Sequence, residues 1–278
     1  MLWNKNKLFC DIHPICYTIS VQKEIVKRHV KDFFHKEHFA KTTNQEKLPS
    51  VAFSHSSNMI KRAKGVDLTS QENKVVNIML SCSKLNGVII HPGEAFSFWK
   101  ILGRSTKKKG FKEGRVLSRT GLTTGVGGGL CNLANTIHLL VLHSPLEIIE
   151  FHNHSDALAP DEGERVPFST GTSVSYNYVD YRFKNTTDQD VQLFLWCEDD
   201  ILYAELRSET DFPYRYRLVE EDHHFKKEEN KYYRVSKIYK EISDAVTGNV
   251  VKKELILDNH SEVMYEYTLI PKDQIREY

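Results

Sequence analysis

Hydrophobic residues recur at helical intervals in three parts of the chain, and each part predicts one helix. In the first, residues 20–40, the apolar positions stand among Lys, Arg and Glu, so we expect an amphipathic helix that docks on the rest of the protein. Its apolar positions are Val21, Ile25, Val30, Phe33, Phe34 and Phe39. The polar, proline-bearing stretch 41–50 that follows is typical of a linker.

The second helix is predicted over residues 70–86. Its apolar face consists of Val75, Val76, Met79, Cys82 and Leu85. Thr69 and Glu72 have the spacing of a capping box at its start, and Gly87 favours a left-handed stop at its end. Because free cysteines are often buried, we interpret Cys82 as a small core residue.

A third helical repeat begins at Leu130 and advances by about four residues to Val141, and His143-Ser144-Pro145 ends it. Residues 100–129, which precede it, are polar and rich in glycine and show no periodicity. In a compact domain, a stretch of this length indicates either a functional loop or a structural element that the pattern conceals.

The other patterned segments predict strands. They are 88–90, 146–151, 172–184 with a bulge near Asn177, 190–197, 201–207, and a hairpin over 231–256 that turns at 247–249. The sequence thus predicts an α+β fold, with helices packed on a mostly antiparallel sheet. We divide the chain into an N-terminal helical segment (1–49), a central domain (50–210) and a C-terminal β-rich extension (211–278).

Composition excludes several classes of protein. Hydrophobic residues make up 40% and charged residues 27%, so the chain is globular and not disordered. The net charge of +1 gives no global attraction to nucleic acid. No apolar run is long enough for a membrane span, and the first twenty residues lack the apolar core of a signal peptide. We therefore expect a cytoplasmic protein with reduced thiols, and association with the cell envelope stays open.

Four glycines within five residues lead directly into the third helix, at Gly125 and Gly127–Gly129, and Cys131 follows them. Such a loop can point several amides at one place, and a helix start adds a positive dipole end. Both effects lower the pKa of a thiol, so Cys131 is a candidate nucleophile. The backbone amides of Gly128, Gly129 and Leu130 are candidates for stabilising an oxyanion.

A cysteine nucleophile needs a base and a group that orients the base. The strand at 146–151 leads to His152 and His154, which an extended backbone points to the same side. Asp180, in the next β segment, is the candidate for orienting an imidazole. This order of Cys, His and acid is that of papain-like and transglutaminase-like thiol enzymes, a fold-level analogy. The two histidines with Cys131 also suit a metal, but no nearby ligand spacing completes a site, so we expect neither a metal nor a cofactor.

Eight basic residues and one acidic residue lie between Lys100 and Arg119. A solvated loop is the ordinary explanation. Because the run leads toward Cys131, it also suits reception of an anionic substrate. The candidate anion-binding residues are Lys107, Lys108, Lys109, Arg115 and Arg119. Aromatic residues are too sparse among them to favour nucleic acid.

Four motifs occur in order along the chain: PGEAFSF at 92–98, GGGLC at 127–131, HNHS at 152–155 and DYRFKNTT at 180–187. Together they resemble the VanW family of vancomycin B-type resistance clusters, over roughly residues 50–210. The resemblance implies a bacterial protein linked to glycopeptide resistance and peptidoglycan. The chain departs from the family pattern at Asn132, Phe151, Asn153 and Gly171, where Gln, Arg, Pro and Asp are usual.

Two functions are compatible with the motifs and the resemblance. In the first, Cys131 is the nucleophile, His154 or His152 the base and Asp180 the orienting acid of an acyl transferase or hydrolase acting on peptidoglycan-type peptides. In the second, the same groove is a non-catalytic binding module for a cell-wall precursor or a protein. Thiol reactivity separates them, because a binding module has no need of a low-pKa cysteine.

Overall fold

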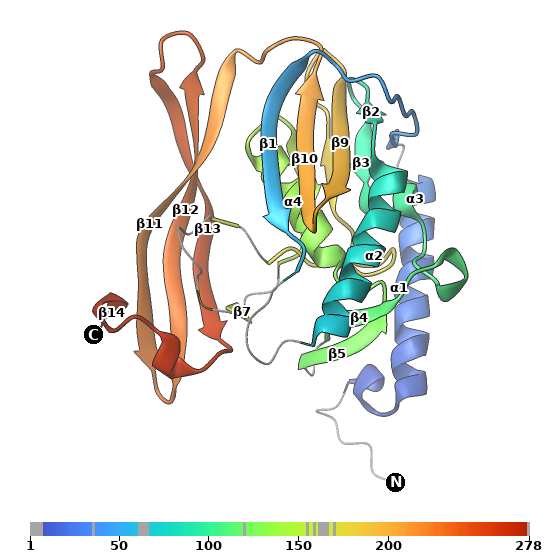
Figure 1. Cartoon of the computed structure of the whole chain (residues 1–278), viewed down its shortest axis with the longest axis vertical. Helices are drawn as coiled ribbons and strands as arrows, with labels where there is room; N and C mark the ends of the chain where they lie inside the picture. Colours follow the sequence, from blue (N-terminus) through green and yellow to red (C-terminus); the bar gives the residue numbers. More distant parts are fainter. Residues whose placement is uncertain are drawn as a thin grey trace.

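The computed structural model describes residues 8–34, 37–60, 67–118, 121–153, 156–157, 160, 167–168 and 171–276. The main body is a four-stranded antiparallel sheet with two helices packed against it (Figure 1). In spatial order the strands are β1 (Ser50–Asn58), β10 (Ile201–Ser208), β9 (Val191–Glu198) and β2 (Val88–Ile90). The helices are α2 (Leu68–Leu85) and α4 (Leu130–Leu142). This is an α+β fold, as predicted.

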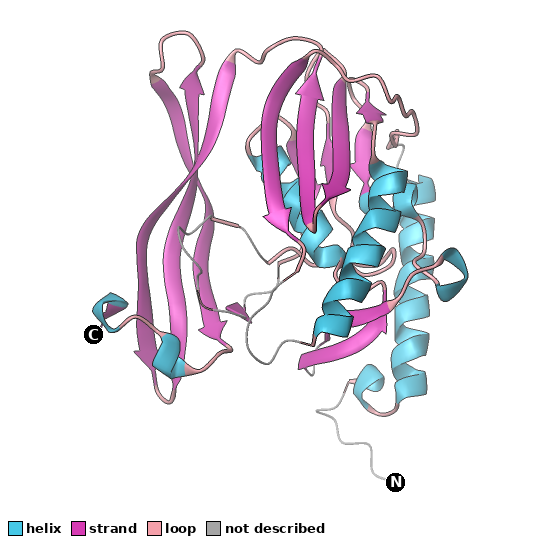
Figure 2. Ribbon diagram, in the orientation of Figure 1, coloured by secondary structure: helices cyan, strands magenta, loops and turns pink. Residues whose placement is uncertain are grey.

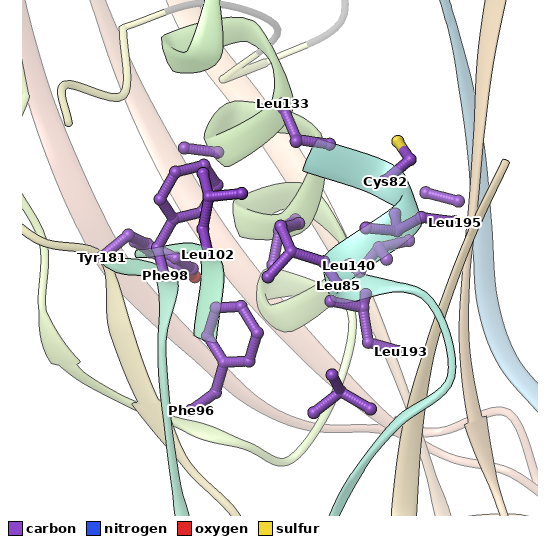
Figure 3. Packing of buried hydrophobic residues seen from close by; sticks show 14 of the residues in the cluster. Cys82, Leu85, Phe96, Phe98, Leu102, Leu133, Leu140, Tyr181, Leu193 and Leu195 are labelled. Carbon is purple, nitrogen blue, oxygen red and sulfur yellow. The ribbon is translucent and has the colours of Figure 1, made fainter. Parts of the chain in front are cut away.

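The hydrophobic core lies between this sheet and the two helices. Alternate residues of β10 are buried along the whole strand, because successive side chains of a strand point to opposite faces. Figure 3 shows the side chains that meet in the core, among them Leu193 and Leu195 of β9, Leu85 of α2, and Leu133 and Leu140 of α4. Cys82 is buried in the same cluster, which confirms its interpretation as a core residue.

The helices predicted over 70–86 and from Leu130 onward are confirmed as α2 and α4. The start of α2 differs from the prediction in its cap. Asp67 is the N-cap residue, and its carboxylate accepts a hydrogen bond from the Thr69 amide at 3.1 Å, so the expected capping box at Thr69 is wrong. His143 caps the C-terminus of α4, directly before Ser144-Pro145, where the sequence predicted the stop.

A smaller three-stranded sheet lies beside the main body, in the order β3 (Ala95–Ser97), β8 (Arg182–Lys184) and β6 (Glu147–Glu150). The short helix α3 (Phe98–Leu102) follows β3. The strand expected over 172–184 is reduced to β8, because a tight turn occupies residues 175–179, with Asn177 at a φ of 53°. The expected bulge is therefore a turn.

The glycine-rich stretch 100–129 contains structure that its sequence conceals. After the 3-10 turn η2 (Lys107–Lys109), the strands β4 (Glu113–Ser118) and β5 (Gly121–Val126) pair as an antiparallel hairpin (Figure 2). Most of its described residues are exposed or half-buried, so no alternation of apolar residues marks its strands.

The C-terminal part is a long antiparallel ribbon of β11 (Tyr214–Glu228), β12 (Lys231–Asp244) and β13 (Val250–Val263), drawn at the left of Figure 1. The predicted hairpin that turns at 247–249 is confirmed, whereas β11 was not predicted. Two short strands pair in parallel with its edges, β14 (Ile275–Arg276) and β7 (Asp156–Ala157). The remaining short elements are the 3-10 turns η1 (Phe9–Asp11), η3 (Tyr267–Leu269) and η4 (Lys272–Gln274).

The N-terminal helix α1 (Pro14–Phe34) begins before the predicted helix and docks differently. Ile25 is its one buried residue among those described, and its other apolar residues do not form the expected docking face. Val30, Phe33 and Phe34 are exposed instead. Among the helices of the described ranges, none combines the length and the apolar character needed to cross a membrane.

Candidate functional site

Cys131 is the second residue of α4, at the helix start that the sequence predicted, two positions after the N-cap residue Gly129. Its side chain is half-buried, and its Sγ lies 3.8 Å from the carbonyl oxygen of Val174, to which the thiol donates. Burial raises the pKa of the Cys131 thiol, although hydrogen bonds with Val174 and with its own backbone act in the opposite direction. The thiol is therefore protonated at neutral pH, and the expected low pKa is wrong.

The glycines before Cys131 allow the backbone to pack closely. A Cβ atom on Gly128 would lie 2.2 Å from the backbone carbon of Gly114, and one on Gly129 would lie 2.1 Å from the side chain of Lys74. The Gly128 amide donates to the Gly125 carbonyl at 3.2 Å, so this turn uses one of the three amides proposed for an oxyanion. For Gly129 and Leu130 that role stays a prediction.

Asn77 holds this loop in place, and sequence reasoning did not single it out. The residue lies on α2 and is fully buried. Its side-chain amide donates to the carbonyls of Gly128 at 2.9 Å and Lys112 at 3.1 Å, and its oxygen accepts from the Lys112 amide at 2.7 Å. An asparagine on a helix gives no local signal of such contacts, because they depend on segments at least 35 positions away.

His152 lies close in the fold to the residues around Cys131 but bonds elsewhere. Its carbonyl accepts from the Ser173 amide at 2.8 Å, and the next residue, Val174, contacts the sulfur of Cys131. The exposed ring of His152, however, has its Nε2 2.9 Å from the carboxylate of Glu150. The structure therefore brings the His152 backbone toward Cys131 and pairs the imidazole with an acid. His154 lies outside the described residues.

Asp180 is fully buried and has four hydrogen-bond donors around its carboxylate. They are the Ser97 hydroxyl at 2.5 Å, the Trp99 amide at 3.1 Å, its neighbour Tyr181's amide at 2.9 Å and Arg182 Nε at 2.7 Å. None of these is a histidine. The carboxylate holds the start of α3 and the guanidinium of Arg182. Its proposed orientation of an imidazole stays a prediction.

A cluster of paired charges extends from Asp180 to α1. Arg182 donates to both oxygens of Asp32 at 2.7 and 2.9 Å, and Arg28 makes a two-pronged contact with Glu150. Burial alone would raise the pKa of Asp32 and Glu150, but the bonds from these arginines outweigh it and hold both pKa values below their usual range.

A buried histidine lies deeper in α4, and sequence reasoning did not single it out. His138 is 1% exposed, stacks on Phe151 at 4.2 Å and has its Nδ1 3.1 Å from the Tyr181 hydroxyl. Burial, together with the nearby Lys240, lowers the pKa of His138 to about 3. Its imidazole is thus neutral at ordinary pH. Phe151, one of the departures from the family pattern, is partly buried and packs against the core.

Two lysines of the basic run belong to a depression lined by Lys107, Gly110, Phe111, Lys112 and Glu113. Lys107 pairs with Glu113 at 2.7 Å. Lys108 and Lys109 of η2 and Arg115 of β4 are exposed, and Arg119 lies outside the described residues. The depression adjoins the glycine loop, because the Lys112 carbonyl accepts from the Gly127 amide at 2.9 Å. Across the described ranges, no three His, Cys, Asp or Glu side chains are grouped to hold a metal ion.

The chain is similar to one protein family and to two known proteins. The family model described as "VanW like protein" matches residues 73–207. The "Vancomycin B-type resistance protein VanW" of Enterococcus faecalis is 26% identical over 227 residues, which cover 82% of each chain. The chain belongs to the VanW family.

A second relative, the "Uncharacterized protein YoaR" of Bacillus subtilis, is 29% identical over 123 residues, 44% of this chain and 39% of that protein. No solved structure matches. The matched range of the VanW family model runs from α2 to β10 and includes Cys131, His152 and Asp180. The family resemblance inferred from the four motifs is thereby confirmed.

Proposed function

We propose that this VanW-family chain acts in glycopeptide resistance as a non-catalytic module that binds a peptidoglycan-type peptide or wall precursor. The observation that supports it is the environment of Cys131. A thiol nucleophile needs a lowered pKa and an adjacent base. The pKa of Cys131 is instead raised by burial, and its thiol donates to the Val174 carbonyl.

The ligand surface in this proposal is the basic depression beside the glycine loop. Lys107 and Lys112 line it, and Lys108, Lys109 and Arg115 are exposed neighbours of these lining residues in the chain. Cell-wall peptides carry carboxylates that such cations bind. Gly127 and Lys112 connect the depression to the loop that precedes Cys131. The name of the E. faecalis relative, a vancomycin B-type resistance protein, is consistent with a wall-derived ligand.

Calorimetric titration with a purified stem-peptide muropeptide tests the binding. We expect the pair Lys108→Gln and Lys109→Gln to weaken binding by about tenfold, since a charge-assisted contact contributes about 1.5–3 kcal/mol. The matched control is Lys84→Gln with Lys272→Gln, two exposed lysines outside the basic run. Equal affinity of all three proteins would contradict the proposed surface.

The thiol is tested separately. At pH 6, iodoacetamide should label Cys131 no faster than Cys10 and Cys16, and Cys131→Ala should bind the muropeptide as the wild type does. Mass spectrometry of muropeptides incubated with wild type and Cys131→Ala completes the test. A new product that requires Cys131 would establish the thiol enzyme and reject the binding module.

A further inference from the structure

The helix α1 turns its apolar residues away from the protein. Ile15, Ile19, Val26, Val30 and Phe33 form one stripe along it, which we call the α1 stripe, because their spacings of four, seven, four and three residues return to the same side of a helix. Their exposed fractions run from 51% at Val30 to 83% at Phe33. A surface helix of a globular protein normally buries this stripe against the core.

Residues on the opposite side of α1 attach the helix to the domain, and this leaves the α1 stripe exposed. Arg28 and Asp32 make the ion pairs with Glu150 and Arg182, and Lys100 adds a contact with Asp32 at 3.0 Å. His29 approaches Asn177 at 3.3 Å. Polar contacts thus attach the helix to the domain, and they fix its orientation with the apolar stripe outward. In Figure 1, α1 is the outermost helix on the side away from the ribbon.

The stripe has the length and borders of a helix that lies on a surface. From Ile15 to Phe33 it extends about 27 Å at 1.5 Å per residue. Lys23, Lys27 and Lys31 are exposed along one border, where Glu24, paired with Lys27, is the one described acid. This local excess of positive charge contrasts with a whole chain of net charge +1.

We propose that the α1 stripe binds the surface of an anionic phospholipid bilayer, with α1 parallel to the membrane plane. An apolar stripe bordered by lysines is the pattern of interfacial helices, whose lysines reach lipid phosphates while the apolar side chains enter the acyl boundary. A second copy of the chain fits less well. In an antiparallel pair of α1 helices, Lys23 and Lys27 would approach their counterparts, and Gln22 would interrupt the seam.

Vesicle co-sedimentation of the full chain tests this proposal. The wild type should bind vesicles of equal parts phosphatidylglycerol and phosphatidylcholine, and bind phosphatidylcholine vesicles more weakly. The triple variant Val26→Ser, Val30→Ser, Phe33→Ser should lose about tenfold or more in affinity for the anionic vesicles, because it removes the apolar contact. The matched control Val246→Ser, Val250→Ser, Val251→Ser changes three apolar residues, each more than half exposed, at the β12–β13 turn and should bind normally.

A second part of the experiment tests the lysines beside the α1 stripe. Lys23→Gln with Lys27→Gln should weaken binding to the anionic vesicles alone, whereas Lys252→Gln with Lys253→Gln, two ion-paired lysines of the ribbon, should not. Failure of the wild type to bind anionic vesicles, or equal loss in stripe and control variants, overturns the proposal. So does a wild-type dimer in sedimentation velocity that the stripe variant dissolves without any vesicle binding. Muropeptide binding is independent of these outcomes and should be unchanged in the stripe variant.

Discussion

The two helices α4 and α1 are attached to the protein in opposite ways. Nearly all residues of α4 are buried, and its apolar side chains fill the space under the four-stranded sheet. In α1 Ile25 is the one buried residue among those described, and ion pairs through Arg28 and Asp32 make the attachment. The apolar residues of both helices recur at helical intervals, so this periodicity alone does not determine which side of a helix faces the core.

Because the two helices are attached differently, their attachment should be sensitive to different mutations. Apolar packing depends on shape and volume, and it is insensitive to salt. A paired charge needs its partner, since removal of one member leaves the other buried without compensation. The attachment of α1 is therefore sensitive to single charge changes, whereas that of α4 is sensitive to lost volume.

The largest effect should come from the α4 side. Leu133→Ala removes a fully buried side chain from the core and should lower the free energy of unfolding by about 2–5 kcal/mol, because of lost burial and the cavity left behind. Urea denaturation followed by circular dichroism measures it. Met79→Ala on α2, where the side chain is 51% exposed, is the control and should stay within about 0.5 kcal/mol. Similar losses in both variants would refute the packing account.

The α1 side should respond to a charge change without any loss of volume. Asp32→Asn keeps the shape but removes the negative charge between Arg182 and Lys100, and it should cost about 1.5–3 kcal/mol. Limited proteolysis should then cleave within α1 before it cleaves the main body. Glu24→Gln, which breaks the exposed pair with Lys27, should cause no measurable change. Unchanged protection of α1 in Asp32→Asn would mean that other contacts hold the helix.

The sequence predicted the fold best where burial produces a strong period. The repeat from Leu130 to Val141 became α4, and the alternation over 190–197 and 201–207 became β9 and β10. The hairpin of β4 and β5 escaped prediction, because its mostly solvated residues do not alternate in polarity. The docking of α1 was wrong because a periodic pattern locates an apolar face but does not say what covers it.

The sequence predicted the position of Cys131 better than it predicted the chemistry of the candidate site. Cys131 does begin a helix behind a glycine turn. Its raised pKa depends on the surrounding burial, which no local pattern reports. The contact of Asp180 with the Arg182 guanidinium was not predicted, because an aspartate has the same sequence signature whether it faces solvent, an imidazole or a guanidinium. The catalytic roles proposed for Cys131, His152, His154 and Asp180 stay predictions.

The smallest predicted difference between α4 and α1 is their response to mild acid. The pKa of His138 in α4 is lowered to about 3, below the value of about 6.5 that an unfolded chain gives. Below pH 6.5 the unfolded state therefore binds a proton that the folded state does not, and stability falls as the pH is lowered. Between pH 7 and pH 5.5 this should amount to about 1 kcal/mol from His138 alone. Asp32 and Glu150 have pKa values below their usual range, so the attachment of α1 keeps its charges over the same interval.

Urea titrations at pH 7 and pH 5.5 measure the difference, with His138→Asn as the comparison. Asparagine does not titrate, and its side chain can place a polar atom toward the Tyr181 hydroxyl that His138 now contacts. The variant will be less stable at both pH values, because it leaves space beside Phe151, so the change between the two values is the relevant quantity. That change should be smaller in the variant by about 1 kcal/mol. Burial also lowers the pKa of His55 and His143, and both contribute equally to wild type and variant. The same pH dependence in both proteins would mean that folding does not lower the pKa of His138, and this residue would then not distinguish the acid response of α4 from that of α1.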